Sequence, residues 1–161
     1  MRVRKYSNRD LPDMIAIWND VVDEGNSFPQ EEPLDKKTGT EFFGSQSCSS
    51  VAVDFGGNIH GLYILHPNNV GRCSHICNAS FAVAPESRGQ GVGKDLVNDC
   101  IRQAKALGFS ILQFNAVVET NEPAKSMYEH MGFVPLGTIP GGFRLKDGSF
   151  ANICLYYLEL K

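Results

Sequence analysis

The sequence predicts an α/β fold built around a mixed β-sheet. Short apolar runs of strand length are separated by segments of helical periodicity and by turns rich in glycine or proline. A strand–helix–strand passage over 76–118 predicts a parallel pair of strands joined by a right-handed crossover. The hairpins around it predict antiparallel neighbours, so the sheet is expected to be mostly antiparallel. No repeat, linker or low-complexity tract divides the chain, and we interpret 1–161 as one domain.

Five elements are expected in the first half of the chain. They are a strand over 2–6, a helix that follows Asp10, a weaker helix over 35–45, and the strands of a β-hairpin over 51–55 and 59–65. Asp10 is a typical helix cap, and apolar residues from Leu11 to Val22 recur at helical spacing. Gly56-Gly57-Asn58 is a turn sequence typical of a hairpin.

The second half is expected to begin with the central strand and the longest helix. The elements are a strand over 76–83, a helix over 92–107, a strand over 111–118, a helix over 121–131, a strand over 133–139, and a hairpin within 145–158 about Lys146-Asp147-Gly148. Pro85 ends the first of these strands and Gly108 ends the long amphipathic helix.

Composition excludes several kinds of partner. The net charge of −3 argues against nucleic acid or a membrane surface as the main partner. No apolar run approaches the roughly 20 residues of a membrane span, and no signal peptide is recognisable. The five cysteines are odd in number and scattered, which is typical of a reducing cytoplasm, so we expect a cytoplasmic protein. Cys73-x-His75-x-Cys77 has no second ligand pair at zinc spacing, and no metal is expected.

A glycine-rich turn, Arg88-Gly89-Gln90-Gly91-Val92-Gly93-Lys94, joins the central strand to the long helix. The first N–H groups of a helix lack intrahelical acceptors and lie at the positive end of the helix dipole. The glycines let a phosphate approach these amides, and Arg88 and Lys94 add positive charge. The turn therefore predicts a binding site for a dianion, and a glycine-rich turn that only caps the helix is the alternative.

Two widespread phosphate-binding loops do not fit this turn. The dinucleotide fingerprint needs a third glycine where Lys94 stands. The nucleoside-triphosphate loop needs glycine in place of Arg88, and serine or threonine in place of Asp95. The pattern that fits is Arg-x-x-Gly-x-Gly over 88–93, which resembles the coenzyme A pyrophosphate loop of the GCN5-related N-acetyltransferase (GNAT) superfamily.

A second block resembles the other signature of that superfamily. Asn121 stands at the start of a predicted helix, and Tyr128 follows seven residues later. Seven residues are close to two helical turns, so both side chains share a face roughly 10 Å apart. The resemblance is clear over 75–135 and continues by element order over the rest of the chain.

Within the superfamily the chain resembles the small-molecule branch. Trp18-Asn19-Asp20-Val21-Val22 and Phe28-Pro29 resemble phosphinothricin acetyltransferases. His75-Ile76-Cys77-Asn78, Phe114-Asn115 and Glu119-Thr120-Asn121 resemble proline-analogue acetyltransferases.

The resemblance implies the GNAT fold, a twisted sheet of about seven strands with a splayed central parallel pair, flanked by about four helices. It also implies acetyl-CoA as co-substrate. It implies that the amides of 88–94 bind the pyrophosphate and that Asn121 binds the pantetheine arm. The amides of Phe81, Ala82 and Val83 would meet the oxyanion and the pantetheine. Tyr128 is the candidate acid that reprotonates the thiolate, and a purely packed aromatic is the alternative for it.

The acceptor amine must lose a proton, because an aliphatic amine with a pKa of about 10 is mostly protonated at neutral pH. Glu119 is the candidate base, since it lies just past a strand end and before Asn121. The alternatives are that Glu119 is a solvated loop carboxylate, that a water chain takes the proton, or that His75 does.

Two asparagines on the central strands are candidate substrate ligands. Asn78 and Ser80 share one face of their strand, and Gln113 and Asn115 share one face of theirs. Because buried amides need hydrogen-bond partners, we expect Asn78 and Asn115 to face the cleft and bind substrate or cofactor. The alternative is a hydrogen bond between the two strands.

The sequence thus predicts an acetyl-CoA-dependent N-acetyltransferase that acts on the primary or secondary amine of a small molecule, an amino acid or an analogue, by direct attack on the thioester. A protein or peptide N-acetyltransferase and a non-catalytic acyl-CoA sensor are the alternatives. Specificity is expected from 20–45 and from 141–144, where Arg144 can pair with a substrate carboxylate. A homodimer stays open, because strand edges can be paired, covered or bare.

Overall fold

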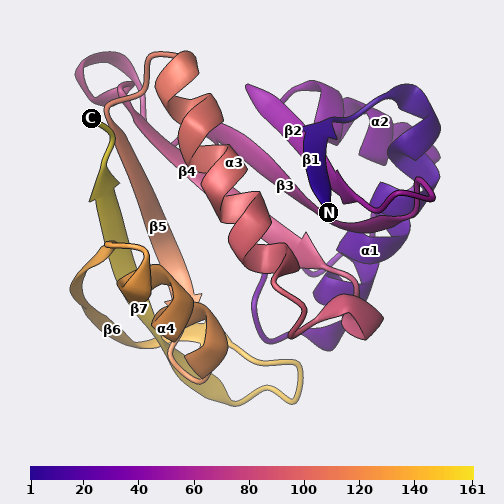
Figure 1. The fold of residues 1–161 in the computed structure, drawn as a ribbon. Coiled ribbons are helices and arrows are strands. Elements are labelled where there is room, and N and C mark those ends of the chain that lie inside the picture. The colour runs from indigo at the N-terminus through magenta and orange to yellow at the C-terminus, as the bar shows by residue number, and fades with distance from the viewer.

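The computed structural model describes residues 1–161, whose strands form a seven-stranded mixed sheet in the order β1-β2-β3-β4-β5-β7-β6 (Figure 1). Only β4 and β5 run parallel, and every other neighbouring pair is antiparallel. The strands are β1 (Arg2–Lys5), β2 (Cys48–Val53), β3 (Ile59–Pro67), β4 (Ile76–Val83), β5 (Ile111–Val118), β6 (Val134–Arg144) and β7 (Phe150–Glu159). The helices are α1 (Leu11–Glu24), α2 (Lys36–Gly44), α3 (Val92–Ala106) and α4 (Glu122–His130). The predicted mixed sheet of seven strands with four helices is confirmed.

Helices cover both faces of the sheet and create two cores. One core holds Trp18 of α1 and Phe43 of α2 against the sheet, and the other holds Leu96 of α3. Successive residues of β3 alternate between these cores, so Leu62 joins the first and Tyr63 the second, and neither is accessible to solvent. This is the pattern of a strand buried on both faces.

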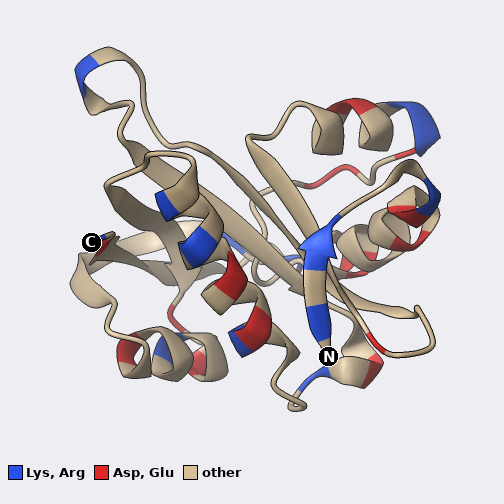
Figure 2. Cartoon of the chain, turned by 45° about the horizontal axis from the view of Figure 1, so that its top comes forward, with Lys and Arg blue, Asp and Glu red and all other residues tan.

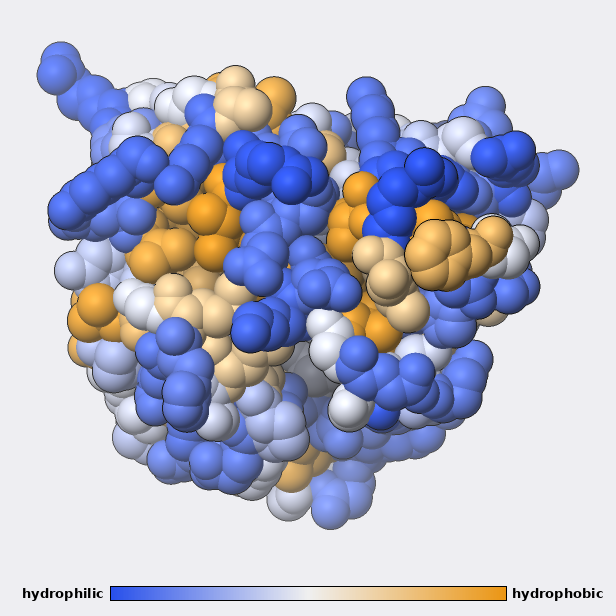
Figure 3. Space-filling view, viewed as in Figure 1, coloured by the Kyte–Doolittle hydropathy of each residue, from blue (hydrophilic) through white to orange (hydrophobic).

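The solvent face of α3 is polar. In Figure 3 a hydrophilic band runs down the middle of the visible face, where α3 lies in Figure 1, and hydrophobic residues flank it on both sides. Basic and acidic residues are interspersed along the helices seen in Figure 2. No helix combines the length and the hydropathy that crossing a membrane requires.

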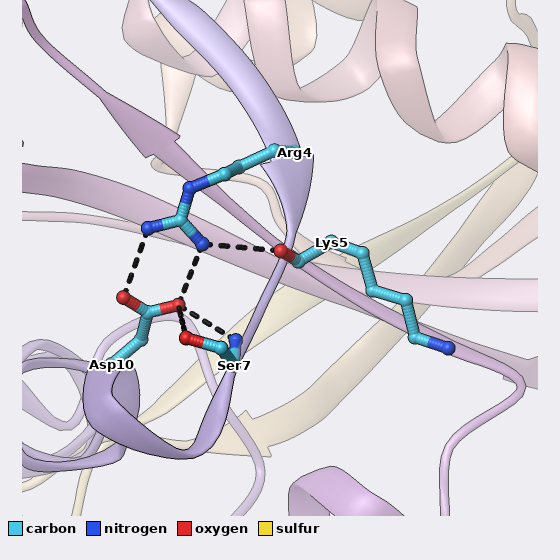
Figure 4. A network of polar contacts seen from close by, with 4 residues as sticks. All are labelled: Arg4, Lys5, Ser7 and Asp10. Carbon is cyan, nitrogen blue, oxygen red and sulfur yellow. Dashed lines mark hydrogen bonds and ion pairs between the residues drawn. The ribbon is translucent and has the colours of Figure 1, made fainter.

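Asp10 stands at the N-cap position of α1, as predicted, but its side chain makes no capping hydrogen bond to that helix. Its carboxylate accepts hydrogen bonds from both terminal nitrogens of Arg4, at 2.7 and 3.0 Å, and from the Ser7 amide at 2.7 Å (Figure 4). The bond from Arg4 is the main reason why the pKa of this buried carboxyl falls to about 2. A paired carboxylate of this kind links the start of α1 to β1.

The last two strands form a hairpin that is longer than predicted. The predicted turn about Lys146-Asp147-Gly148 is present, closed by a Leu145 amide bond to the Ser149 carbonyl at 2.7 Å. However, β6 does not end at Ile139 but continues to Arg144. The register shift between Ile139 and Phe143 absorbs Pro140-Gly141-Gly142, which would otherwise interrupt a strand.

Candidate active site

A cleft opens where the two parallel strands separate. β4 and β5 pair at only two positions, Ile76 with Ile111 and Cys77 with Leu112, whereas β4 stays paired with β3 up to Val83. The space between the diverging strands has a volume of about 240 Å³. Its lining comes from β4, β5, α4 and the segment that follows α1: Ser27, Phe28, Pro29, Asn78, Ala79, Ser80, Phe81, Phe114, Asn115, Ala116, Val117, Val118, Asn121, Ala124 and Tyr128.

Backbone amides of β4 point into the gap where β4 and β5 are no longer paired. The Ala84 amide donates to the His60 carbonyl at 2.9 Å, so even-numbered residues of β4 direct their polar groups toward β3. By this alternation the amides of Phe81 and Val83 face the cleft, whereas that of Ala82 is directed to β3. Of the three residues expected to meet an oxyanion, two therefore present a donor to the cleft.

The glycine-rich turn leaves a row of amides without acceptors. No backbone or side-chain group of the protein accepts from the N–H groups of 89–94, and the first bonded amide is that of Asp95, to Gly91 O at 3.1 Å. Gly89 and Gly91 have φ of +74° and +84°, and a Cβ atom at either would meet nothing within 4 Å. This geometry leaves room for an anion at the N-terminus of α3 and fits a pyrophosphate. In Figure 3 the surface is hollowed beside that end of α3.

The two basic residues of this turn differ in their surroundings. Lys94 is exposed and has no ion pair within the protein. Arg88 is bound to Glu24 at the end of α1 by bonds of 2.6 and 3.2 Å, so its charge is already balanced. The expected contribution of Arg88 to anion binding is therefore smaller than that of Lys94.

Tyr128 is both packed and directed to the cleft. Its side chain is 8% exposed and its ring lies 4.6 Å from that of Phe114, centroid to centroid. No group of the protein hydrogen bonds to its hydroxyl, and the residue lines the cleft together with Asn121, which accepts from the Ala124 amide at 3.4 Å. Burial raises the pKa of Tyr128, so the phenol carries its proton at neutral pH.

Asn78 and Asn115 both line the cleft, as predicted from strand parity, and they do not bond to each other. The Asn78 carbonyl accepts from the Ala79 amide at 2.8 Å, and its NH₂ group has no partner in the protein. Both ends of Asn115 are engaged, since it accepts from Gln113 at 2.9 Å and donates to Asn68 at 2.6 Å. Asn78 is therefore the freer donor.

Glu119 does not line the cleft. Its carboxylate accepts from the Asn152 amide group at 2.8 Å, and its backbone amide donates to the Asn152 carbonyl at 2.9 Å. Both bonds hold the residue against β7. Sequence reasoning missed Asn152, Asn68 and Glu24, because nothing in their local pattern marks contacts with residues so far along the chain.

A larger cavity of about 750 Å³ lies next to the cleft and shares Phe28 and Pro29 with it. Its walls are the segment that follows α1 and the β6–β7 hairpin, and they contain charged residues of both signs: Asp23, Glu31, Arg144 and Lys146. These are the regions expected to determine specificity. No group of three or more His, Cys, Asp or Glu side chains is arranged to hold a metal ion.

Comparison with known proteins identifies the family. The model of the acetyltransferase (GNAT) family matches residues 14–133. The chain belongs to the GNAT family. It is therefore an acyltransferase, and acetyl-CoA is the acetyl donor of that family, in keeping with the open amides of 89–94.

Individual GNAT proteins are similar over most of the chain. The N-acetyltransferase aca1 of Schizosaccharomyces pombe is 28% identical over 84% of this chain and 73% of its own length. YwnH of Bacillus subtilis, provisionally named a phosphinothricin acetyltransferase, is 29% identical over 88% of both. The structure of a GCN5-related N-acetyltransferase from Kribbella flavida is 31% identical, with a TM-score of 0.91 over 99% of this chain and 97% of that one.

Proposed function

We propose that this GNAT enzyme transfers the acetyl group of acetyl-CoA to the primary or secondary amine of a small molecule, an amino acid or an analogue, by direct attack on the thioester. One observation carries the proposal: the cleft between β4 and β5 brings the Tyr128 hydroxyl, the free NH₂ of Asn78 and cleft-facing β4 amides to one place. The cavity beside it gives an amine a route to that place.

On the donor side, acetyl-CoA supplies the activated acetyl group. The amides of 89–94 and the Lys94 ammonium bind the pyrophosphate, and Asn121 binds the pantetheine arm. The amides of Phe81 and Val83 stabilise negative charge as it develops on the carbonyl oxygen. Tyr128 donates the proton that the leaving thiolate needs.

On the acceptor side, a proton must leave the amine before attack. Glu119 does not line the cleft and is bonded to Asn152, so in this proposal it takes the proton through water rather than by direct contact. The NH₂ group of Asn78 orients the acceptor by hydrogen bonding to it. The name of YwnH, which refers to a small amino-acid analogue, supports a small acceptor.

The test is coenzyme A release, detected through its thiol, from acetyl-CoA and a panel of amino acids, polyamines and short peptides. We expect turnover with an amino acid or analogue, and a fall in kcat of about 100-fold in Tyr128→Phe because the acid is lost. Tyr157→Phe is the matched control, since Tyr157 is half-buried, lines neither cavity and makes no hydroxyl bond.

Three outcomes count against the proposal. Turnover restricted to peptides would favour a protein N-acetyltransferase. A Tyr128→Phe rate within about twofold of wild type would remove Tyr128 as the acid. Absence of thermal stabilisation by acetyl-CoA would contradict the role given to 89–94.

A further inference from the structure

A chain of three polar side chains lies behind the pyrophosphate loop, defined here as 88–94. Asp54 follows β2, His60 is on β3, and Ser87 belongs to the short 3-10 helix η3 (Pro85–Ser87). His60 Nδ1 lies 2.7 Å from Ser87 Oγ, and His60 Nε2 lies 3.0 Å from Asp54 Oδ2. The three residues are 33 positions apart at most, and the fold alone brings them together.

The same residue types form the catalytic triad of serine hydrolases, but Ser87 is not accessible enough to act as a nucleophile. Ser87 is 2% exposed and lines neither cavity. A hydroxyl without room for a substrate carbonyl cannot attack one. The role of these three hydrogen-bonded side chains must therefore lie in the segment that Ser87 holds in place.

Ser87 immediately precedes the pyrophosphate loop and is the one buried polar side chain between 84 and 94. His60 holds this segment at two points, because its carbonyl accepts from the Ala84 amide at 2.9 Å and its ring bonds to Ser87. An ionised Asp54 can only accept, which places the proton of a neutral His60 on Nε2 and leaves Nδ1 to accept from the Ser87 hydroxyl. Asn58 and His60 both donate to Asp54, and these bonds lower the pKa of its carboxyl.

We propose that His60 and Ser87 are positioning residues that fix the start of the pyrophosphate loop and so set the affinity for acetyl-CoA, while Asp54 selects the His60 tautomer that accepts from Ser87. The proposal rests on the function proposed above for 88–94. The free amides of 89–94 are useful only if they converge, and the loop has two positive-φ glycines that leave it pliable. A buried bond at Ser87 restricts the loop where it leaves β4, which reduces the ordering cost of binding.

Two substitutions of His60 separate its two bonds. By bond count, the amide of asparagine reaches the place of Nδ1 and keeps the bond to Ser87, whereas that of glutamine reaches the place of Nε2 and keeps the bond to Asp54. We expect His60→Gln and Ser87→Ala to raise the dissociation constant for acetyl-CoA about tenfold, measured by titration calorimetry on folded protein. His60→Asn should stay within about threefold of wild type. His66→Gln is the control, because His66 lies on the same strand and its ring bonds only to the Pro67 carbonyl.

The pattern of affinities decides the proposal. Equal affinities of His60→Gln and His60→Asn for acetyl-CoA, together with equally lowered Tm values, would mean that the three side chains only stabilise the fold. That result would overturn the proposal. Failure of the proposed function would be seen differently, as absence of acetyl-CoA binding by the wild-type protein. Lys94→Ala is the reference for a loss of affinity that arises within the loop itself. If Lys94→Ala raises the dissociation constant for acetyl-CoA and His60→Gln leaves it unchanged, the proposal is also overturned.

Discussion

The two sides of the cleft, proposed above to bind the donor and the acceptor, are held in place by different contacts. On the donor side, the loop before α3 depends on backbone geometry and on buried contacts such as that of Ser87, which is 2% exposed. On the acceptor side, exposed ion pairs join the β6–β7 hairpin to Asp23 at the end of α1, through Lys146, and to Glu31 in the segment that follows α1, through Arg144. The side chains of Arg144 and Glu31 are 58% and 69% exposed.

This difference matches what each side has to recognise. Exposed ion pairs contribute about 0–1 kcal/mol each, so the acceptor side can rearrange at little cost. The donor always carries the same pyrophosphate, and a fixed row of amides suits it. Rigidity on one side and adjustable contacts on the other allow one family to use one donor with many acceptors.

The largest expected effect lies outside both sides of the cleft, at the partly buried ion pair Arg4–Asp10 where α1 begins. We expect Asp10→Asn to lower the free energy of unfolding by about 2 kcal/mol, because Arg4 loses a buried charged partner. Denaturant unfolding measures this, with Asp13→Asn as the control, since Asp13 is exposed on the same helix and has no ion pair.

The same pair predicts a pH dependence of stability. A folded pKa of about 2 lies below the unfolded value of about 4 for aspartate, so the stabilisation is complete above pH 4 and is lost as the pH falls toward 2. In Asp10→Asn, the free energy of unfolding should therefore change less with pH between 4 and 2 than it does in the wild type. An unchanged slope would mean that other carboxylates dominate acid unfolding.

An intermediate effect is expected at the donor side. Gly91→Ala forces a φ of +84° on a residue with a side chain, and strain of about 1–2 kcal/mol should move the loop and raise the dissociation constant for acetyl-CoA about tenfold. Gly108→Ala is matched in strain, with φ of +89° and open space around it, but lies past the other end of α3. Equal affinities of the two variants, measured by calorimetry, would contradict a binding role for the Gly91 backbone.

The smallest effect is expected at Arg144. Arg144→Ala should change the free energy of unfolding by less than about 0.5 kcal/mol, because the pair with Glu31 is exposed. It should raise the KM of a carboxylate-bearing acceptor about fivefold and leave that of the corresponding amide unchanged. Glu31→Gln should have the opposite effect on KM. Equal changes for acid and amide would show that Arg144 does not bind the acceptor carboxylate.

The donor side was largely predictable from the sequence because its determinants are local. β4 and β5 have the predicted bounds, and α3 begins where the glycine pattern places it. The spacing of Asn121 and Tyr128 placed both on the cleft for the same reason, since helical periodicity fixes neighbours within two turns.

The remaining features depend on contacts between distant residues. Asp10 was expected to cap α1, but Arg4 competes for its carboxylate with a charged bond. The partners of Arg88 and Glu119 lie 64 and 33 residues away, at Glu24 and Asn152. No periodicity encodes such pairs, because they form only once the sheet has its order.

The short ladder between β4 and β5 also gives a bound ligand a way to stabilise the fold. With only two paired positions, the sheet is divided into a four-stranded part and a three-stranded part. A ligand that occupies the gap and binds only the folded state stabilises it by mass action, by about 2.7 kcal/mol when its concentration is 100 times the dissociation constant. If acetyl-CoA occupies the gap as proposed, the folded enzyme is harder to unfold, and therefore harder to digest with a protease, when its donor is bound than when it is not.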